Sequence, residues 1–269
     1  MKKPDIRDFI FLPVKGRRYL ATIFAQEPGI LSGTKGLTKA CRRLGVDVRR
    51  CTKDGSRIRK IETIALVEGD AKQMALAEEE LIGWIAKASG IATAAWKAKA
   101  VAGKKLRVVS GAWKKMPPPL KELIRQAITD GGIHFRISEK PFIYLDKNYV
   151  KIFRGVREAL FAVRDLKPFI KVVQLKSKGK KLLQEAAWAA KFGAGIIMID
   201  TGKMGDVERV DLALRERGLR KKVRLAFAGE ISIEDLATLR RMPVEIVDIG
   251  KAIVDAPLLD MRMDVLRRI

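Results

Sequence analysis

FIKVVQLKSKGKKLLQEAAWAAKFGAGIIMID, residues 169–200, is the stretch that decides the fold. It opens with an apolar run at 169–175 and closes with another at 195–199. Between them, residues 180–192 carry the longer, mixed pattern of a helix. A strand, a helix and a second strand in this order form a crossover unit, whose two strands run parallel.

The same alternation continues on both sides of this stretch. Strands are predicted at residues 106–109, 142–145, 169–175, 195–199, 223–227 and 245–249. Helices are predicted between them, at 118–129, 149–164, 180–192, 207–217 and 233–240. Repeated strand–helix units favour a TIM-like α/β barrel, with an open doubly wound sheet as the alternative.

The first part of the chain lacks this alternation and reads as a mixed α/β segment. Strands are predicted at 18–25, 46–50 and 63–68, and a short helix at 36–44. A long helical stretch starts near residue 72 and ends before Gly103. At the other end of the chain, residues 257–269 are predicted to form a last helix.

Composition excludes several classes of protein. Of 269 residues, 48% are hydrophobic, enough for a core and too many for a disordered chain. No apolar run approaches the ~18 residues that cross a bilayer, and the first residues lack the apolar segment of a signal peptide. Two cysteines, Cys41 and Cys51, are too few for a disulfide framework and suit a reducing cytoplasm. One histidine excludes a multi-histidine metal site.

The charge is the unusual quantity. Lysine and arginine number 55 against 31 acids, a formal net charge of +24. Such an excess favours an anionic partner, namely nucleic acid, a membrane surface or a phosphorylated small molecule, although it also serves solubility. Basic residues between Arg42 and Lys60 are the best candidate nucleic-acid surface, but 6% aromatic residues give little for base stacking.

Polar residues and glycines follow the predicted strands. In a barrel these strand ends meet at one face, where the chemistry takes place, and glycines there let a phosphate approach backbone N–H groups. The residues at these ends are Lys114, Lys115, Asp146, Lys147, Gln174, Asp200, Lys203, Gly229, Glu230, Ser232, Gly250 and Lys251.

Short motifs along nearly the whole chain resemble, in order, those of the quinolinate phosphoribosyltransferase family. Residues 29–33, GILSG, are similar to the family's G-V-L-A-G, and residues 89–93 read S-G-I-A-T as in the family. Further similar segments are KKMPPPL at 114–120, GGIHFR at 131–136, LDKNYV at 145–150, GAGIIMID at 193–200, AGEIS at 228–232 and Ile249-Gly250.

The resemblance implies a fold and a reaction. It implies an N-terminal α/β sandwich domain over 1–104, a barrel over 105–256, and a C-terminal helix over 257–269 that packs back on the first domain. The family transfers a phosphoribosyl group from phosphoribosyl pyrophosphate, with Mg²⁺, to a pyridine dicarboxylate that then loses CO₂. It works as a homodimer.

The resemblance also implies roles for single residues. Asp200, Lys147 and Gln174 are expected to be catalytic, with Asp200 holding Mg²⁺. Lys114, Lys115, His134 and Arg136 are expected to bind the anionic substrates. Gly229, Ser232, Gly250 and Lys251 are expected to hold the 5′-phosphate.

Several positions depart from the family pattern. Glu79 stands where the family has an arginine for the dicarboxylate, and Lys114 also replaces an arginine. Asp146 and Lys147 come in reversed order, and Glu230 replaces a glycine. We therefore predict a divergent phosphoribosyltransferase that acts on another small anionic or heteroaromatic acceptor. The alternatives are the family reaction, quinolinate to nicotinate mononucleotide, and a non-catalytic relic that binds nucleotides or nucleic acid.

Overall fold

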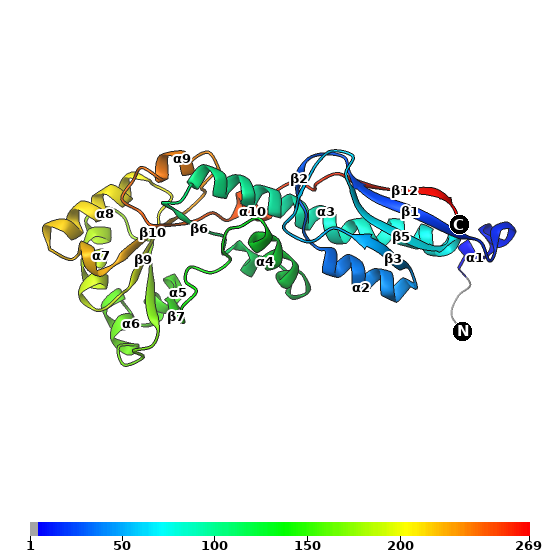
Figure 1. Cartoon of the computed structure of the whole chain (residues 1–269). Coiled ribbons are helices and arrows are strands. Elements are labelled where there is room, and N and C mark those ends of the chain that lie inside the picture. Colours follow the sequence, from blue (N-terminus) through cyan, green and yellow to red (C-terminus); the bar gives the residue numbers. More distant parts are fainter. Residues whose placement is uncertain (1–4) are drawn as a thin grey trace. The chain divides into compact units, whose positions relative to one another are not determined.

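The computed structural model describes residues 5–269 and divides the chain into two compact units (Figure 1). The first unit contains the described residues up to Trp96, together with Pro117–Gly132 and Asp255–Ile269. The second contains Lys97–Met116 and Ile133–Val254. The prediction about a signal peptide falls in part on residues 1–4, which lie outside the described residues.

The first unit is a four-stranded antiparallel sheet with helices against it. The strand order is β12-β1-β5-β3, formed by Met261–Arg268, Arg18–Ala25, Thr63–Asp70 and Asp47–Cys51. Helix α2 (Thr34–Leu44) and the first half of α3 (Ala71–Ala102) share one apolar core with these strands. Smaller elements are α1 (Arg7–Ile10), η1 (Leu12–Val14), β2 (Gly29–Ile30), β4 (Arg57–Ile58), η3 (Pro118–Leu120) and α4 (Lys121–Asp130).

The prediction of a helix at residues 257–269 is wrong. Residues Met261–Arg268 form strand β12, which pairs antiparallel with β1 and forms one edge of the sheet. Met261 and Met263 are buried while Arg262 and Asp264 are exposed, the period of two that a half-buried strand requires. The segment still packs on the first unit, as a strand instead of a helix.

The S-G-I-A-T segment of α3 joins distant parts of the first unit. The Ser89 hydroxyl accepts the Ser32 N–H at 3.0 Å, and the Thr93 hydroxyl accepts the Ile30 N–H at 2.9 Å. A Cβ on Gly90 would lie 1.9 Å from the Pro257 carbonyl oxygen, so the chain before β12 contacts the helix there. The motif therefore has a structural role within the first unit.

The second unit confirms the predicted parallel α/β fold. Its strands are β6 (Arg107–Val109), β7 (Phe142–Leu145), β8 (Ile170–Leu175), β9 (Ile196–Asp200), β10 (Arg224–Ala228) and β11 (Ile246–Asp248). All neighbours are parallel, in the order β6-β11-β10-β9-β8-β7. The strands from β7 to β11 follow one another around the sheet, which is barrel order and excludes the doubly wound alternative.

The sheet curls around a shared interior. One buried cluster draws residues from both outer strands and from the middle of the sheet, including Val109, Val172, Met198 and Ile246, and Tyr144 packs against it. A parallel bridge from Val109 to His134 extends the sheet beyond β6. The sheet is therefore a half-barrel with an apolar inside.

Helices cover the outer side of this sheet. Helices α7 (Gly179–Lys191) and α8 (Gly205–Glu216) pack on β8, β9 and β10 (Figure 1). The remaining helical elements are η2 (Ala112–Lys115), α5 (Lys147–Ile152), α6 (Val156–Ala162), η4 (Arg220–Lys222), α9 (Leu236–Leu239) and α10 (Lys251–Val254).

Two predicted helices are shorter than expected. The helix predicted at 149–164 is two helices, α5 and α6, because the chain turns at Arg154 (φ 62°) and Gly155. The helix predicted at 233–240 is reduced to the single turn α9. In the turn before α9, the Ser232 N–H and hydroxyl both donate to the Asp235 carboxylate.

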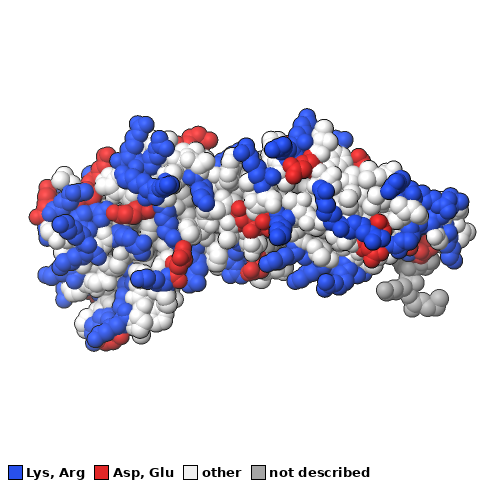
Figure 2. All heavy atoms as spheres, viewed as in Figure 1, with Lys and Arg blue, Asp and Glu red and all other residues white. Residues whose placement is uncertain are grey.

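On the face that Figure 2 shows, positive charge is spread out instead of being gathered in one place. On the face shown in Figure 2, lysine and arginine side chains cover both units and are interrupted by acidic residues. Among residues 5–269, no helix has both the length and the apolar character needed to cross a membrane.

We expect Cys41 to resist alkylation in the folded protein. Burial, and then the nearby Cys51, raise the pKa of the Cys41 thiol to about 11, so fewer than about one thiol in a thousand is ionised at pH 7.5. Iodoacetamide labelling followed by peptide mass spectrometry should show modification of Cys41 only after unfolding in guanidinium. Fast labelling of the native protein at pH 7.5 would contradict the burial described for Cys41.

Candidate active site

Two carboxylates, on strands β9 and β11, end these strands at the same level, with β10 between them. Asp200 of β9 pairs with Ala228 of β10, and Ala228 pairs with Asp248 of β11. Register partners in a parallel sheet point to the same side. The residues two positions earlier, Met198, Ala226 and Ile246, belong to the interior cluster. Asp200, Ala228 and Asp248, which we call the carboxylate row, therefore face the inside of the half-barrel at its carboxyl end.

The structure brings three of the predicted residues together, namely Asp200, Gln174 and Lys147. The Gln174 side-chain amide donates to Asp200 Oδ2 at 2.5 Å, and the Lys147 backbone N–H donates to Gln174 Oε1 at 2.9 Å. The Lys147 side chain is exposed. The side-chain amide of Gln174, on the neighbouring strand β8, thus holds Asp200 in place.

Lys176 is a residue of this site that the sequence did not single out. Its Nζ lies 3.0 Å from Asp200 Oδ2, and the Asp200 side chain is 16% exposed. Lys176 follows the last residue of β8 and is exposed. The sequence signal for Lys176 is its position two residues after Gln174. Side chains two residues apart along a strand point to the same side of the sheet, so Lys176 is expected on the side of Gln174.

The reversed order of Asp146 and Lys147 has a local explanation. Asp146 is the N-cap of α5, and its carboxylate accepts the N–H groups of Asn148 and Tyr149 at 2.7 and 3.1 Å. An aspartate is a favoured N-cap because it satisfies backbone donors that have no partner within the helix. Asp146 therefore starts the helix that carries Lys147.

Asp248 is the second residue that sequence reasoning missed. Its Oδ1 accepts the Gly111 N–H at 2.9 Å, which ties the end of β6 to the end of β11. Burial raises the pKa of the Asp248 carboxyl above its usual value, while Lys114 and Lys115 oppose this rise. Burial, and then the charges of Asp248 and Asp200, also raise the pKa of Tyr144 far above its usual value.

Two of the predicted cations, Lys114 and Lys115, lie on a segment beside the carboxylate row, and Arg136 lies elsewhere, near the start of β7. Lys114 and Lys115 belong to η2, the turn that begins beside Gly111, and Lys114 Nζ lies 5.1 Å from the centre of the Tyr144 ring. The Arg136 guanidinium lies 5.2 Å from the ring of Phe142 at the start of β7. Both cations stack on aromatic rings and keep exposed surface.

His134 lies with other charged residues. Its Nδ1 is 3.5 Å from Glu139 Oε1, and Glu139 also binds Arg107 at 3.1 Å. Burial, and then the charge of Arg107, lower the pKa of His134, so the ring is neutral at pH 7. The His134 side chain therefore lies beside Glu139 and, among the described residues, forms no ion pair with the carboxylate row.

The predicted phosphate residues are placed on the exits of β10 and β11. Gly229 has φ 114°, and a Cβ there would lie 2.6 Å from the Gly202 nitrogen, so the exits of β9 and β10 are in contact. The next residue, Glu230, has φ 50°, a strained conformation for a residue with a side chain. Ser232 already bonds Asp235, whereas Lys251 starts α10 with its side chain exposed.

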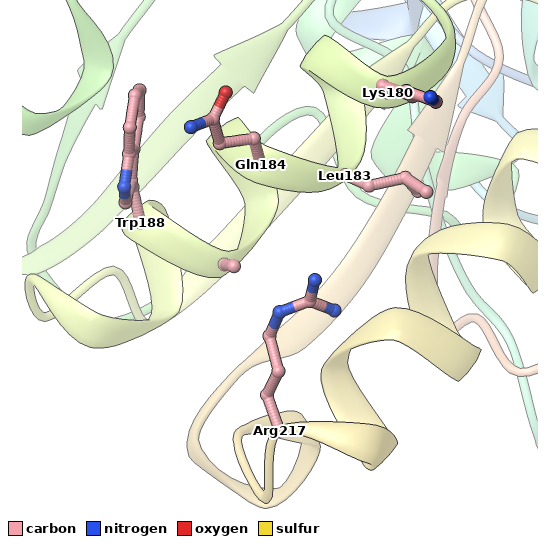
Figure 3. Close-up of a pocket in the computed structure, with 6 residues that line it drawn as sticks. Lys180, Leu183, Gln184, Trp188 and Arg217 are labelled. Atoms are coloured by element: carbon pink, nitrogen blue, oxygen red, sulfur yellow. The ribbon is translucent and has the colours of Figure 1, made fainter.

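A separate hollow lies on the outer helices of the second unit. Figure 3 shows its wall on α7 and beyond the end of α8, formed by Lys180, Leu183, Gln184, Ala187, Trp188 and Arg217. Its lining includes none of the predicted site residues. The strand ends, and not this hollow, carry the candidate active site.

We expect Asp248→Asn to stabilise the protein at neutral pH. Because the folded-state pKa of Asp248 is raised, the parent is most stable below the unfolded value of 3.8 and loses stability as pH rises through the folded value. Thermal denaturation should therefore give the variant a Tm about 2–4 °C higher at pH 7, and a smaller gain at pH 4. A parent with the higher Tm at pH 7 would contradict the burial of this charge.

A half-barrel whose strand ends carry lysines and two carboxylates is typical of enzymes that act on small anionic molecules. The chain belongs to the quinolinate phosphoribosyl transferase family. The family models for the N-terminal and C-terminal domains match residues 8–89 and 91–264. The chain is thus a phosphoribosyltransferase, a glycosyl-transferring enzyme.

Individual relatives agree with this assignment. The chain is 26% identical to a probable nicotinate-nucleotide pyrophosphorylase (carboxylating) of Methanothermobacter thermautotrophicus, over 93% of this chain and 90% of the relative. It is 29% identical to the protein of the same name from Archaeoglobus fulgidus, over 92% of this chain and 94% of that relative. The crystal structure of the Pyrococcus furiosus nicotinate-nucleotide pyrophosphorylase has the same fold, with a TM-score of 0.84 at 23% identity, covering 98% of this chain and 73% of that one.

These comparisons correct one prediction. The sequence departures suggested a divergent member acting on another acceptor, but the relatives are named for the family reaction. One departure also has a local partner, since Glu79 forms an ion pair with Arg7 at 2.5 Å. The prediction of a different acceptor is therefore wrong.

Proposed function

We propose that this chain transfers the phosphoribosyl group of phosphoribosyl pyrophosphate to quinolinate. The pyridine nitrogen bonds to the ribose C1′ as the C1′–oxygen bond to pyrophosphate breaks. The carboxylate next to the nitrogen then leaves as CO₂, a proton from water takes its place, and nicotinate mononucleotide results. The observation that carries this proposal is the match to both family domains, together with relatives that share one name over nine-tenths of the chain.

The charges of the site suit these substrates. Quinolinate brings two carboxylates, and the other substrate brings a pyrophosphate and a 5′-phosphate. Lys114 and Lys115 supply cations beside the strand ends, and lysine binds phosphate well as a point charge. Gly229 and Gly250 offer backbone at the exits of β10 and β11, where barrels of this kind hold a phosphate.

Asp200 has the chemistry needed at the ribose. Departure of pyrophosphate leaves positive charge on C1′ and the ring oxygen, and a fixed carboxylate stabilises that charge. Gln174 and Lys176 hold one oxygen of Asp200 in place. A carboxylate fixed by neighbours needs little reorganisation when the charge develops.

We also propose Mg²⁺ as the cofactor, held in part by Asp200. Mg²⁺ usually takes one or two carboxylates and completes its shell with substrate phosphates and water. Asp200 supplies one such carboxylate, and among residues 5–269 no cluster of three or more His, Cys, Asp and Glu residues forms a closed cage. Bound Mg²⁺ would neutralise charge on the pyrophosphate.

Isothermal titration tests the substrate assignment. In Mg²⁺ buffer, phosphoribosyl pyrophosphate should bind saturably and quinolinate should bind to the same protein. Absence of phosphoribosyl pyrophosphate binding would overturn the proposal. The homodimer remains a prediction of the family resemblance, and light scattering coupled to gel filtration checks it.

A further inference from the structure

The two acids of the carboxylate row differ in their hydrogen-bond and ion-pair partners. Asp200 accepts the Gln174 amide and pairs with Lys176. Asp248 accepts the Gly111 N–H through Oδ1, and among the described residues Oδ2 receives no hydrogen bond and the carboxylate forms no ion pair. Asp248 lies deep in the protein, yet it keeps part of its surface in contact with solvent.

Burying such a carboxylate lowers the stability of the folded protein. A buried charge without an ion-pair partner loses solvation that a single backbone N–H does not replace. The raised pKa of Asp248 reflects that loss. Strongly perturbed acids are concentrated at sites where they act on a ligand, and Asp248 stands at the same level as Asp200.

The spacing of the carboxylate row suits a small ligand. Asp200 and Asp248 are two strands apart, about 9.5 Å between their backbones. The residue between them is Ala228, which adds only a methyl group. Two hydrogen-bond acceptors thus stand on either side of a position with almost no side chain.

The substrates of the proposed reaction offer few groups that fit two carboxylates. Phosphate, pyrophosphate and both carboxylates of quinolinate are anions that Asp200 and Asp248 would repel. The pyridine nitrogen is an acceptor and not a donor. Across both substrates, the hydrogen-bond donors at neutral pH are the two ribose hydroxyls.

We propose that Asp248 is a substrate-contacting residue that accepts a hydrogen bond from a ribose hydroxyl of phosphoribosyl pyrophosphate. This inference rests on the proposed function. It adds to Asp200 a second acid that recognises the sugar, next to the η2 turn that carries Lys114 and Lys115.

A purely structural role is the alternative, because Asp248 also fixes Gly111, which precedes Lys114 and Lys115. Two probes separate these roles. Phosphoribosyl pyrophosphate carries the ribose hydroxyls and the phosphates, whereas inorganic pyrophosphate carries only phosphates. Loss of a ribose contact weakens binding of the first alone, whereas displacement of the lysines weakens binding of both.

The experiment titrates the parent and Asp248→Ala with each probe in Mg²⁺ buffer. The Kd of phosphoribosyl pyrophosphate should rise about 10- to 100-fold, the effect of losing a hydrogen bond to a charged group. The Kd of pyrophosphate should stay within about twofold of the parent. Equal weakening of both ligands, or no change in either, would overturn the inference while leaving the proposed function standing. A parent that binds pyrophosphate but not phosphoribosyl pyrophosphate would overturn both.

Asp248→Asn and Glu208→Gln complete the design. The asparagine keeps an acceptor for the Gly111 N–H, so the fold and the η2 turn are retained even if the alanine variant does not fold. Because it removes the charge, its Kd for phosphoribosyl pyrophosphate should still rise about fivefold or more. Glu208 is exposed on α8, and its neutralisation controls for net charge. A Kd for Asp248→Asn equal to that of Glu208→Gln would overturn the inference.

Discussion

Asp200→Ala is expected to lower kcat for nicotinate mononucleotide formation by at least about 10²–10³-fold, the usual cost of removing one preorganised electrostatic group. Asp200 is held at the end of β9 by Gln174 and Lys176. Its charge is therefore fixed before the ribose becomes cationic. Removing the side chain also leaves Lys176 without its partner, which adds a positive charge where the reaction needs a negative one.

Asp200→Asn tests whether the charge of Asp200, and not the volume of its side chain, is needed for the reaction. The asparagine occupies nearly the same volume, so the Tm should stay close to that of the parent while the rate falls. Steady-state assays with saturating phosphoribosyl pyrophosphate and quinolinate measure kcat, and Glu208→Gln serves as the exposed control. An Asp200→Asn enzyme that retains half of the parent kcat would remove Asp200 from its proposed role.

Gly90→Ala is expected to destabilise the protein by about 3 kcal/mol, the upper end of the usual cost of overpacking. Its Cβ would lie 1.9 Å from the Pro257 carbonyl oxygen, a backbone atom that no side-chain rotation can move away. Helix α3 would have to separate from the chain that leads into β12. Thermal denaturation should show a Tm about 6–12 °C below that of the parent.

Gly83→Ala is the matched control in the same helix. A Cβ on Gly83 meets no atom within 4 Å, and the residue is exposed. Alanine has the higher helix propensity, so this variant should gain up to about 1 kcal/mol. A Gly90→Ala protein as stable as Gly83→Ala would contradict the packing described around the S-G-I-A-T segment.

The half-barrel could be predicted because each of its strands is a short apolar run between helices. Its interior needs β-branched and aliphatic residues, and the run at residues 195–199 supplies them without interruption. The C-terminal segment was mispredicted because Leu, Met and Arg are also good helix formers and Pro257 suits a helix start. The alternation of buried Met261 and Met263 with exposed residues was the correct signal.

The candidate site could be predicted only in part, because its contacts join strands that are far apart in sequence. Asp200 and Gln174 end strands and were recognisable as such. Asp248 falls within an apolar run, and its contact with Gly111 spans 137 positions of sequence. Lys176 stands among other lysines, and only the neighbouring strand shows that it pairs with Asp200.

The most direct test of the central claim is product formation by the purified protein. Phosphoribosyl pyrophosphate, Mg²⁺ and quinolinate labelled in the carboxylate next to the ring nitrogen are supplied together, and released CO₂ and nicotinate mononucleotide are measured. We expect equal amounts of both products, dependent on phosphoribosyl pyrophosphate and formed at least about 10²–10³-fold more slowly by Asp200→Ala. Absence of both products from folded protein that binds phosphoribosyl pyrophosphate would contradict the assignment of quinolinate as the acceptor.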